Sequence, residues 1–157
     1  MKIVLVVVGK TDDKYIQTGI SKFVERLKHY IKFEMVVIPD LKKTKHLSFD
    51  QQKKQEGELI LQTLQAGDKV VLLDERGKEF SSRGFSSFVE KQMVSGIKRL
   101  VFVIGGPYGF SEEVYAIAPQ KISLSQMTFS HQMVRLVFIE QIYRAMTILR
   151  NEPYHHD

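Results

Sequence analysis

The stretch SLSQMTFSHQMVRLVFIEQIYRAMTILRNEPYHHD, residues 123–157, decides how the rest of the chain can be arranged. It begins with a polar loop, continues into a long apolar run and ends in a short polar tail. Apolar residues recur in the run at steps of three and four, which is the spacing of one helix face. This stripe consists of Val134, Phe138, Ile142, Ala145 and Leu149. We therefore expect a helix over residues 131–150, which cannot continue past Pro153.

The expected final helix is also apolar outside its stripe. Four further apolar residues, Met133, Leu136, Val137 and Ile148, lie among Arg135, Glu140, Arg144 and Thr147. A helix that is apolar on more than one side needs a second surface to cover it. We therefore expect a homodimer that forms through this helix.

Composition places the chain among single-domain globular proteins. A length of 157 residues is enough to bury a core without cross-links, and the absence of cysteine fits a reducing compartment. The apolar run at the N-terminus is too short for a signal sequence, and no run could span a bilayer. The net charge of +5 permits a polyanionic partner, and much of it is local. The local excess comes from Lys42, Lys43, Lys45, His46, Lys53 and Lys54.

The pattern along the chain predicts an α/β fold. Residues 2–8 (KIVLVVV) form a near-continuous β-branched run, which is typical of a strand covered on both faces. The further expected strands are 33–38, 69–73, 99–104 and 121–124. The first expected helix follows a cap at Asp12 or Asp13 and carries apolar residues from Ile16 to Leu27. Further helices are expected over residues 48–65 and 86–94, and a short one after Ser111. Alternation of strands and helices predicts a mostly parallel sheet with helices on both faces.

Three unusual loops follow the later strands: residues 74–77, 105–109 and 125–130. Ligands of such sheets bind beyond the carboxyl ends of the strands. The glycines of 105–109 stand in the wrong place and at the wrong spacing for a dinucleotide fingerprint, and no P-loop is present. Taken alone, the loops 74–77 and 105–109 are most simply turns. The loop 124–129 lacks glycine and proline, so its main-chain groups need partners that a ligand could supply.

The tail adds groups capable of proton chemistry, Tyr154, His155 and His156. Disorder is the first expectation for a terminal tail, and two adjacent histidines without other ligands do not indicate a metal site. A lone Arg144 would be a surface charge. The residues by themselves thus indicate a dimeric, ligand-binding α/β domain and leave its reaction open.

Several motifs together resemble the RlmH family of SPOUT-class methyltransferases, which methylate N3 of a pseudouridine in 23S ribosomal RNA. The motifs are LDERGKEFSS, FVIGGPYGF, SLSQMTFSHQMVRLVFIEQIYRA and NEPYHHD. The resemblance covers residues 1–157 as one domain. Two positions depart from the family pattern: Ser130 stands where many members have proline, and His156 where a basic side chain is usual. The first would loosen the entry to the helix, and the second would remove one phosphate contact.

The resemblance implies a C-terminal trefoil knot, a homodimer with the site at its interface, and S-adenosylmethionine as methyl donor, with no metal. The residues implied to contact the donor are Leu73, Gly105, Leu124, Ser125, Gln126, Met127, Thr128 and Phe129. The residues implied to bind and activate the substrate are Arg144, Tyr154 and His155. We assign His155 as candidate base, Arg144 as anion stabiliser or phosphate contact, and Tyr154 as positioning group.

The resemblance further implies that the substrate is 23S rRNA within an assembled ribosome, in the cytoplasm. The lysines at 42–46 and 53–54 then become candidate RNA contacts. Two alternatives from other classes stay open: a ribosome-binding factor without catalysis, and a different small-molecule enzyme on a flavodoxin-like sheet.

Overall fold

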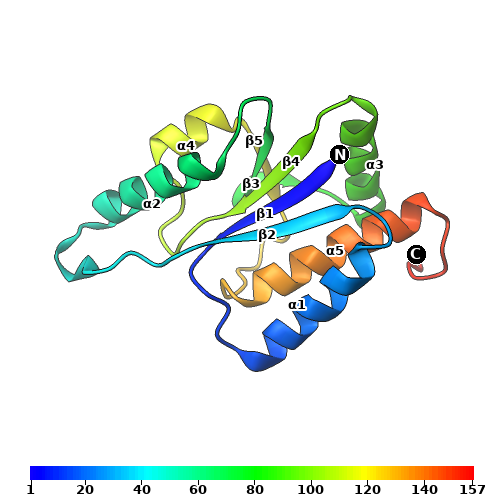
Figure 1. Cartoon of the computed structure of the whole chain (residues 1–157), viewed down its shortest axis with the longest axis horizontal. Coiled ribbons are helices and arrows are strands. Elements are labelled where there is room, and N and C mark those ends of the chain that lie inside the picture. Colours follow the sequence, from blue (N-terminus) through cyan, green and yellow to red (C-terminus); the bar gives the residue numbers. More distant parts are fainter.

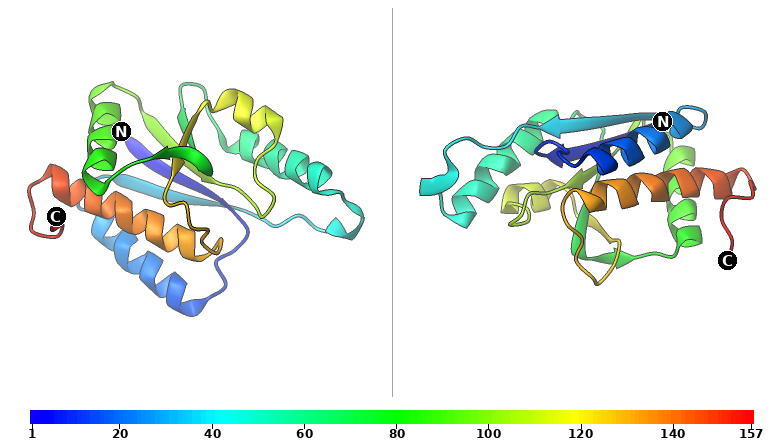
Figure 2. Two further views of the ribbon diagram at one scale, coloured as in Figure 1. Left: turned by 180° about the vertical axis from the view of Figure 1, so that it is seen from behind. Right: turned by 90° about the horizontal axis from the view of Figure 1, so that it is seen from below.

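The computed structural model describes all residues 1–157 and contains a five-stranded, wholly parallel sheet with helices on both faces (Figures 1 and 2). The strand order is β2-β1-β4-β3-β5. The strands are β1 (Lys2–Val8), β2 (Lys32–Ile38), β3 (Lys69–Glu79), β4 (Arg99–Ile104) and β5 (Gln120–Ser123). The helices are α1 (Lys14–Leu27), α2 (Phe49–Thr63), α3 (Ser82–Val94), α4 (Glu112–Ile117) and α5 (Met133–Leu149), with a 3-10 turn η1 (Thr44–His46). The expected α/β class with a parallel sheet is confirmed.

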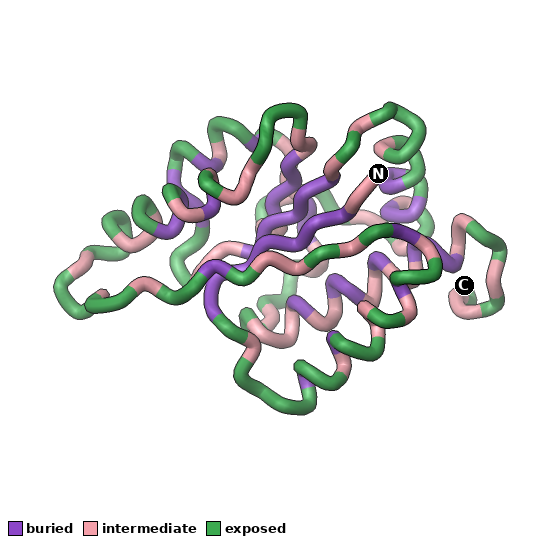
Figure 3. Tube along the Cα trace, viewed as in Figure 1, coloured by how far each residue is buried: buried purple, intermediate pink, exposed green.

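Both faces of the central strands are buried, as the β-branched run at the N-terminus predicts. Alternate side chains of β1 enter two different cores. Ile3, Leu5 and Val7 pack with α1, α3 and α5, while Val4, Val6 and Val8 pack with α2 and α4. Figure 3 shows the burial concentrated in these central strands. The sheet is therefore packed on both faces, and it positions the loops at the carboxyl ends of its strands.

Two element boundaries differ by four or more residues from the sequence prediction. β3 does not end at Leu73 but continues to Glu79, because it resumes pairing with β5 after an irregularity. Leu73 and Lys78 both lie opposite Ile122, so the intervening residues bulge out at the carboxyl edge. α3 begins at Ser82 rather than at Ser86, because the hydroxyl of Ser81 accepts a hydrogen bond from the Gly84 amide.

Helix caps account for most of the other boundaries. Ser48 and Gln51 form the expected capping box at the start of α2, and the Ser111 hydroxyl caps α4. Asp13 is the N-cap residue of α1, as expected, but its side chain makes no capping bond. The side-chain oxygen of Gln132, just before α5, instead accepts from the amides of Asp12 and Asp13, each at 3.0 Å. A residue far along the chain thus caps α1.

Helix α5 packs between α1 and α3 against the sheet (Figure 2). Three members of its predicted stripe, Phe138, Ile142 and Ala145, are buried, and the two at the ends are half-buried. The apolar residues outside the stripe are also half-buried, so neighbouring helices of the same chain cover part of this second side. No helix, α5 included, combines the length and apolarity needed to cross a membrane.

Arg135, one of the polar residues of α5 outside the apolar stripe, lies in the interior of the protein. Its side chain is only 1% exposed and is the largest fully buried one in the chain. One guanidinium nitrogen donates to the Val8 carbonyl oxygen at 2.7 Å, and another donates to the Thr11 hydroxyl at 2.9 Å. Burial lowers the pKa of Arg135, and the charges of Asp40 and Asp12 oppose that effect. Arg135 therefore ties the start of α5 to the carboxyl end of β1.

We expect Arg135→Ala to lower the free energy of unfolding by about 3 kcal/mol, because it leaves the buried Val8 carbonyl unpaired and creates a cavity. Urea unfolding followed by circular dichroism measures this change. Lys22→Ala, on the exposed side of α1, is the control and should change stability by less than about 0.5 kcal/mol. Equal stability of the two variants would contradict the role of Arg135.

Candidate functional site

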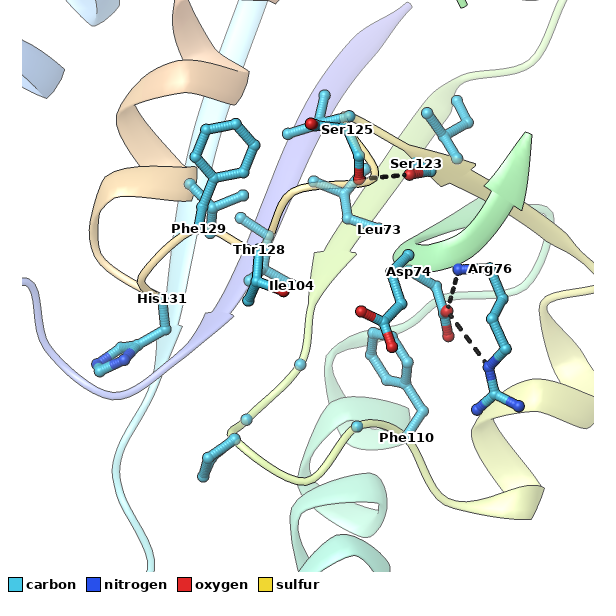
Figure 4. A pocket seen from close by; sticks show the side chains of 18 of the residues that line it. Leu73, Asp74, Arg76, Ile104, Phe110, Ser123, Ser125, Thr128, Phe129 and His131 are labelled. Carbon is cyan, nitrogen blue, oxygen red and sulfur yellow. Dashed lines mark hydrogen bonds and ion pairs between the residues drawn. The ribbon is translucent and has the colours of Figure 1, made fainter. Parts of the chain in front are cut away.

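A cleft of about 640 Å³ opens at the carboxyl ends of the neighbouring strands β4, β3 and β5 (Figure 4). Its walls come from the three loops that the sequence singles out. Residues 73–76 form one wall, residues 104–110 a second, and the segment from Ile122 to His131 a third. Val134, in the first turn of α5, completes the lining. The structure thus joins three separate sequence motifs into a single concave site.

Seven of the eight residues expected to contact a methyl donor line this cleft. They are Leu73, Gly105, Leu124, Ser125, Met127, Thr128 and Phe129. Gln126 is not part of the lining and is exposed, as are Met127 and Thr128 at the rim. Leu124, Ser125 and Phe129 are half-buried. The predicted set is therefore spatially coherent except at Gln126.

The main chain of the β5–α5 loop is largely free to bind a ligand. The Ser123 hydroxyl donates to the Ser125 carbonyl at 3.0 Å, and the Met127 amide donates to the Ser125 hydroxyl at 2.9 Å. The amides and carbonyls of Gln126, Thr128 and Phe129 make no hydrogen bond within the chain. The loop ends at Ser130, whose hydroxyl accepts from the Met133 amide at 3.2 Å. Ser130 thus fastens the entry to α5.

Asp74 supplies a fixed negative charge to the cleft wall. Its carboxylate accepts hydrogen bonds from the Tyr115 hydroxyl at 2.5 Å and from the Arg76 amide at 2.9 Å. Burial by itself would raise the pKa of Asp74, but these two bonds together with the charges of Arg76 and Lys121 lower it. Burial and the bond to Asp74 raise the pKa of Tyr115. Asp74 is therefore ionised and Tyr115 protonated at neutral pH.

Glu56 of α2 supports the glycine-rich wall from behind. It is 5% exposed, and its Oε1 atom has no hydrogen-bond partner. A Cβ atom added to Gly106 would lie 2.5 and 2.6 Å from the two carboxyl oxygens, so a side chain there would require the Glu56 carboxyl group to move. Burial raises the pKa of Glu56, a bond with Gln52 opposes the rise, and the charge of Asp40 adds to it.

A second polar cluster forms where the tail folds back on the end of α5. Arg144 donates to Glu140 Oε1 at 2.5 Å, and the Tyr154 hydroxyl donates to the same oxygen at 2.9 Å. The Arg144 guanidinium lies over the Tyr154 ring, 4.8 Å from its centroid. Burial, and then the bond to Glu140, raise the pKa of Tyr154 to about 12. The tail is thus ordered against α5, and Tyr154 acts as a hydrogen-bond donor.

Both ring nitrogens of His155 are occupied in this cluster. The Arg144 guanidinium can only donate, so His155 Nδ1, at 3.1 Å, must be the acceptor. His155 Nε2 then carries the proton and donates to Asp157 at 3.0 Å. Asp157 is held in turn by Arg83 of α3 at 2.7 Å. The ring of the candidate base is therefore held in place from both sides, and its acceptor nitrogen is paired with Arg144.

The β5–α5 loop, which lines the cleft, and the C-terminal tail lie at opposite ends of α5 (Figure 1). Val134 lines the cleft and Arg144 belongs to the cluster, ten residues further on. A rise of about 1.5 Å per residue separates the two by about 15 Å. The structure thus gathers Arg144, Tyr154 and His155 together, but one chain does not bring them to the cleft.

Sequence reasoning missed three residues of these sites. Glu140 stands one turn before Arg144, a spacing that allows an ion pair and could have been recognised. Tyr115 and Glu56 carry no such signal, because their partners Asp74 and Gly106 are remote in sequence.

Comparison with known proteins agrees with this architecture. A family model described as "Predicted SPOUT methyltransferase" matches residues 1–155. A "Ribosomal RNA large subunit methyltransferase H" from Parabacteroides distasonis is 66% identical over 157 residues, which is 100% of both chains. A protein of the same description from Christiangramia forsetii is 65% identical over 156 residues, or 99% of both chains.

Among solved structures, a tRNA (m1G37) methyltransferase from Aquifex aeolicus matches the whole chain and 76% of its own, with a TM-score of 0.58. The identity is only 17%, so this likeness concerns the fold alone.

We expect Glu56→Gln to become progressively more stable than the wild type as the pH rises above 4.5, the ordinary pKa of the carboxyl. The native state holds the Glu56 proton more tightly than the unfolded chain, so its stability falls as pH rises toward the native pKa. Glutamine does not titrate. A ten-fold difference in proton affinity corresponds to about 1.4 kcal/mol. Urea unfolding from pH 4 to pH 8 measures the difference, and a difference independent of pH would refute the buried acid.

Proposed function

The chain belongs to the SPOUT methyltransferase family, and we propose that it methylates large-subunit ribosomal RNA with S-adenosylmethionine as methyl donor. The observation that carries the proposal is the cleft built from all three family-like loops. More finely, we propose that the target is N3 of a pseudouridine in 23S rRNA. Full-length identity of 66% to a ribosomal RNA large subunit methyltransferase supports this choice.

The residues of the cleft fit the methyl donor. An adenine edge needs main-chain donors and acceptors, and the main-chain groups of Thr128 and Phe129, which line the cleft, are unpaired. Gly105 and Gly106 allow close approach of the backbone, while Leu73, Ile104 and Phe129 provide apolar walls. The donor supplies a methyl group on a positively charged sulfur, and the ionised Asp74 in the wall complements such a cation. We infer that these residues hold the donor and exclude water from it.

The tail cluster fits the other half of the reaction. N3 of the target carries a weakly acidic proton that must leave before N3 can accept a methyl group in line. We infer that His155 Nδ1 takes this proton after the substrate displaces Arg144. Arg144 then faces the anionic ring or a flanking phosphate, and Tyr154, held by its hydroxyl bond to Glu140, positions the ring. The Arg144–His155 contact thus keeps both groups in place until the substrate arrives.

A dimer would bring the two halves of the site together. About 15 Å of α5 separates Val134 in the cleft from Arg144 in the cluster, so one chain leaves both halves incomplete. We infer that the tail cluster of one protomer faces the cleft of the other, through a two-fold contact that includes α5. Half-buried apolar side chains on α5, such as Val137 and Ile148, support this contact. We further propose a single domain in which the last part of the chain forms a trefoil knot, as family membership suggests.

The proposed substrate is 23S rRNA within the assembled ribosome, which would place the enzyme in the cytoplasm. A net charge of +5 is modest for binding naked RNA, so shape must supply part of the selectivity.

Labelled S-adenosylmethionine and assembled ribosomes test the proposal directly. The purified chain should bind the donor, and label should appear in the RNA on a pseudouridine. Neither binding of the donor nor transfer would favour a ribosome-binding factor, and binding of a different small molecule would favour another enzyme of this fold. Either outcome would reject methyl transfer.

We expect His155→Ala to lower turnover by about 10²- to 10⁴-fold, the usual contribution of a positioned base, while the affinity for S-adenosylmethionine stays nearly unchanged. His156→Ala is the matched control, because its side chain is exposed and makes no hydrogen bond or ion pair in the chain. Single-turnover methyl transfer and calorimetric titration measure the two quantities. Unchanged turnover in His155→Ala would dismiss its role as base.

A further inference from the structure

Two aromatic rings from separate elements stack on the surface beside the cleft. Phe49 begins α2 and Tyr108 belongs to the glycine-rich loop after β4. Their ring centroids are 4.1 Å apart and their planes differ by 19°. Phe49 is nevertheless 63% exposed and Tyr108 39% exposed, and neither ring belongs to either hydrophobic core. Single exposed apolar residues are ordinary, but an exposed stacked pair leaves a broad aromatic surface facing solvent.

The pair stands at the entrance of the proposed active site. Tyr108 lines the cleft itself, and Phe49 continues its aromatic surface outward. The segment before Phe49, which includes η1, projects beyond the carboxyl ends of the strands (Figure 1). A molecule that reaches the cleft from this side must therefore pass the two rings.

The surroundings of the pair are positively charged. Residues 39–54 contain five lysines and two aspartates. Lys42, Lys43 and Lys45 are exposed and form no ion pair. Lys53 follows Phe49 by one helical turn on the same side of α2, and pairs with Asp50 at 3.4 Å. The excess cations complement a polyanion. The same cations disfavour the binding of a second copy of this chain to this patch, because the lysines of the two copies would repel each other.

We propose that Phe49 and Tyr108 form a stacking platform for an unpaired nucleobase of the RNA, next to the base that enters the cleft. The inference rests on the proposed function and deepens it by naming how the substrate is held. Aromatic faces stack with any base, and RNA is read chiefly where its bases are unpaired. The lysines of the projecting segment neutralise the phosphates on either side, so the platform and the cations serve one strand together.

Substitution of Phe49 separates the contribution of aromatic stacking to RNA binding from the contribution of the lysines. Phe49→Ala should weaken binding of a single-stranded RNA of about ten nucleotides by about 5- to 150-fold, the loss expected for one stacked base. The salt dependence of binding should stay the same, because no charge is removed. Exchange of Lys42, Lys43 and Lys45 for glutamine should instead change the salt dependence. The slope of the logarithm of the binding constant against the logarithm of the salt concentration should fall in magnitude by about one for each lost phosphate contact. Lys22→Gln on α1 is the control for the lysine exchanges and should leave the salt dependence of RNA binding unchanged.

Two further variants test whether the ring itself matters. Phe49→Leu keeps the apolar bulk without an aromatic face, and it should bind RNA as weakly as the alanine variant. Phe49→Trp introduces the only tryptophan of the chain, whose fluorescence can be followed. RNA should quench its emission, whereas an abasic strand of the same length should not. Tyr15→Ala, which removes an exposed aromatic ring from α1, should leave RNA affinity unchanged.

The outcomes distinguish the platform from the proposed function. Full RNA affinity in Phe49→Leu, or equal quenching by the abasic strand, would overturn the platform. A change of sedimentation in Phe49→Ala would assign the rings to a subunit contact and would also overturn it. Methyl transfer by the wild-type preparation is measured alongside. If the wild type transfers methyl groups while Phe49→Leu binds RNA normally, only the platform fails; if the wild type transfers none, the proposed function fails.

Discussion

The buried contact between Arg135 and the carboxyl end of β1 determines where the final helix begins. Burying a guanidinium is costly unless its hydrogen bonds are made, and here the Val8 carbonyl and the Thr11 hydroxyl accept bonds from the two terminal nitrogens, while Nε has no partner. Gln132 adds to the same junction by capping α1. The start of α5 is therefore fixed beside the strand ends, where the loops of β3, β4 and β5 form the cleft. The loop that precedes α5 becomes a wall of that cleft as a consequence.

The length and direction of α5 then carry its other end away from the cleft. The tail returns onto this far end and surrounds Arg144 with Glu140, Tyr154 and His155. Each group is already oriented, and the basic nitrogen of His155 is paired with Arg144. The proposed site from two copies would close this separation, which side-chain motion within one chain cannot close. In that proposal the tail cluster of one chain and the cleft of the other form the two halves of the site.

Much of this arrangement could be predicted from local sequence. The strands at residues 2–8 and 99–104, the capping box at Ser48 and the cap at Ser111 depend on neighbouring residues, and all are confirmed. The extension of β3 to Glu79 could not be predicted, because it depends on pairing with the distant β5. The same holds for burial of Arg135 and for the packing of Glu56 behind Gly106, since both depend on contacts between remote elements. Helical periodicity identified α5 but could not show which of its polar residues lies inside.

Mixing two inactive variants tests the shared site most directly. Gly105→Leu fills the cleft and His155→Ala removes the candidate base, so each homodimer should be inactive. A mixed dimer has one site with an intact cleft from one chain and an intact tail from the other. Co-expression in equal amounts should therefore restore about a quarter of the wild-type methyl transfer, because half of the dimers would be mixed and each would carry one working site. Activity no greater than the sum of the separate variants would contradict a site built from two chains.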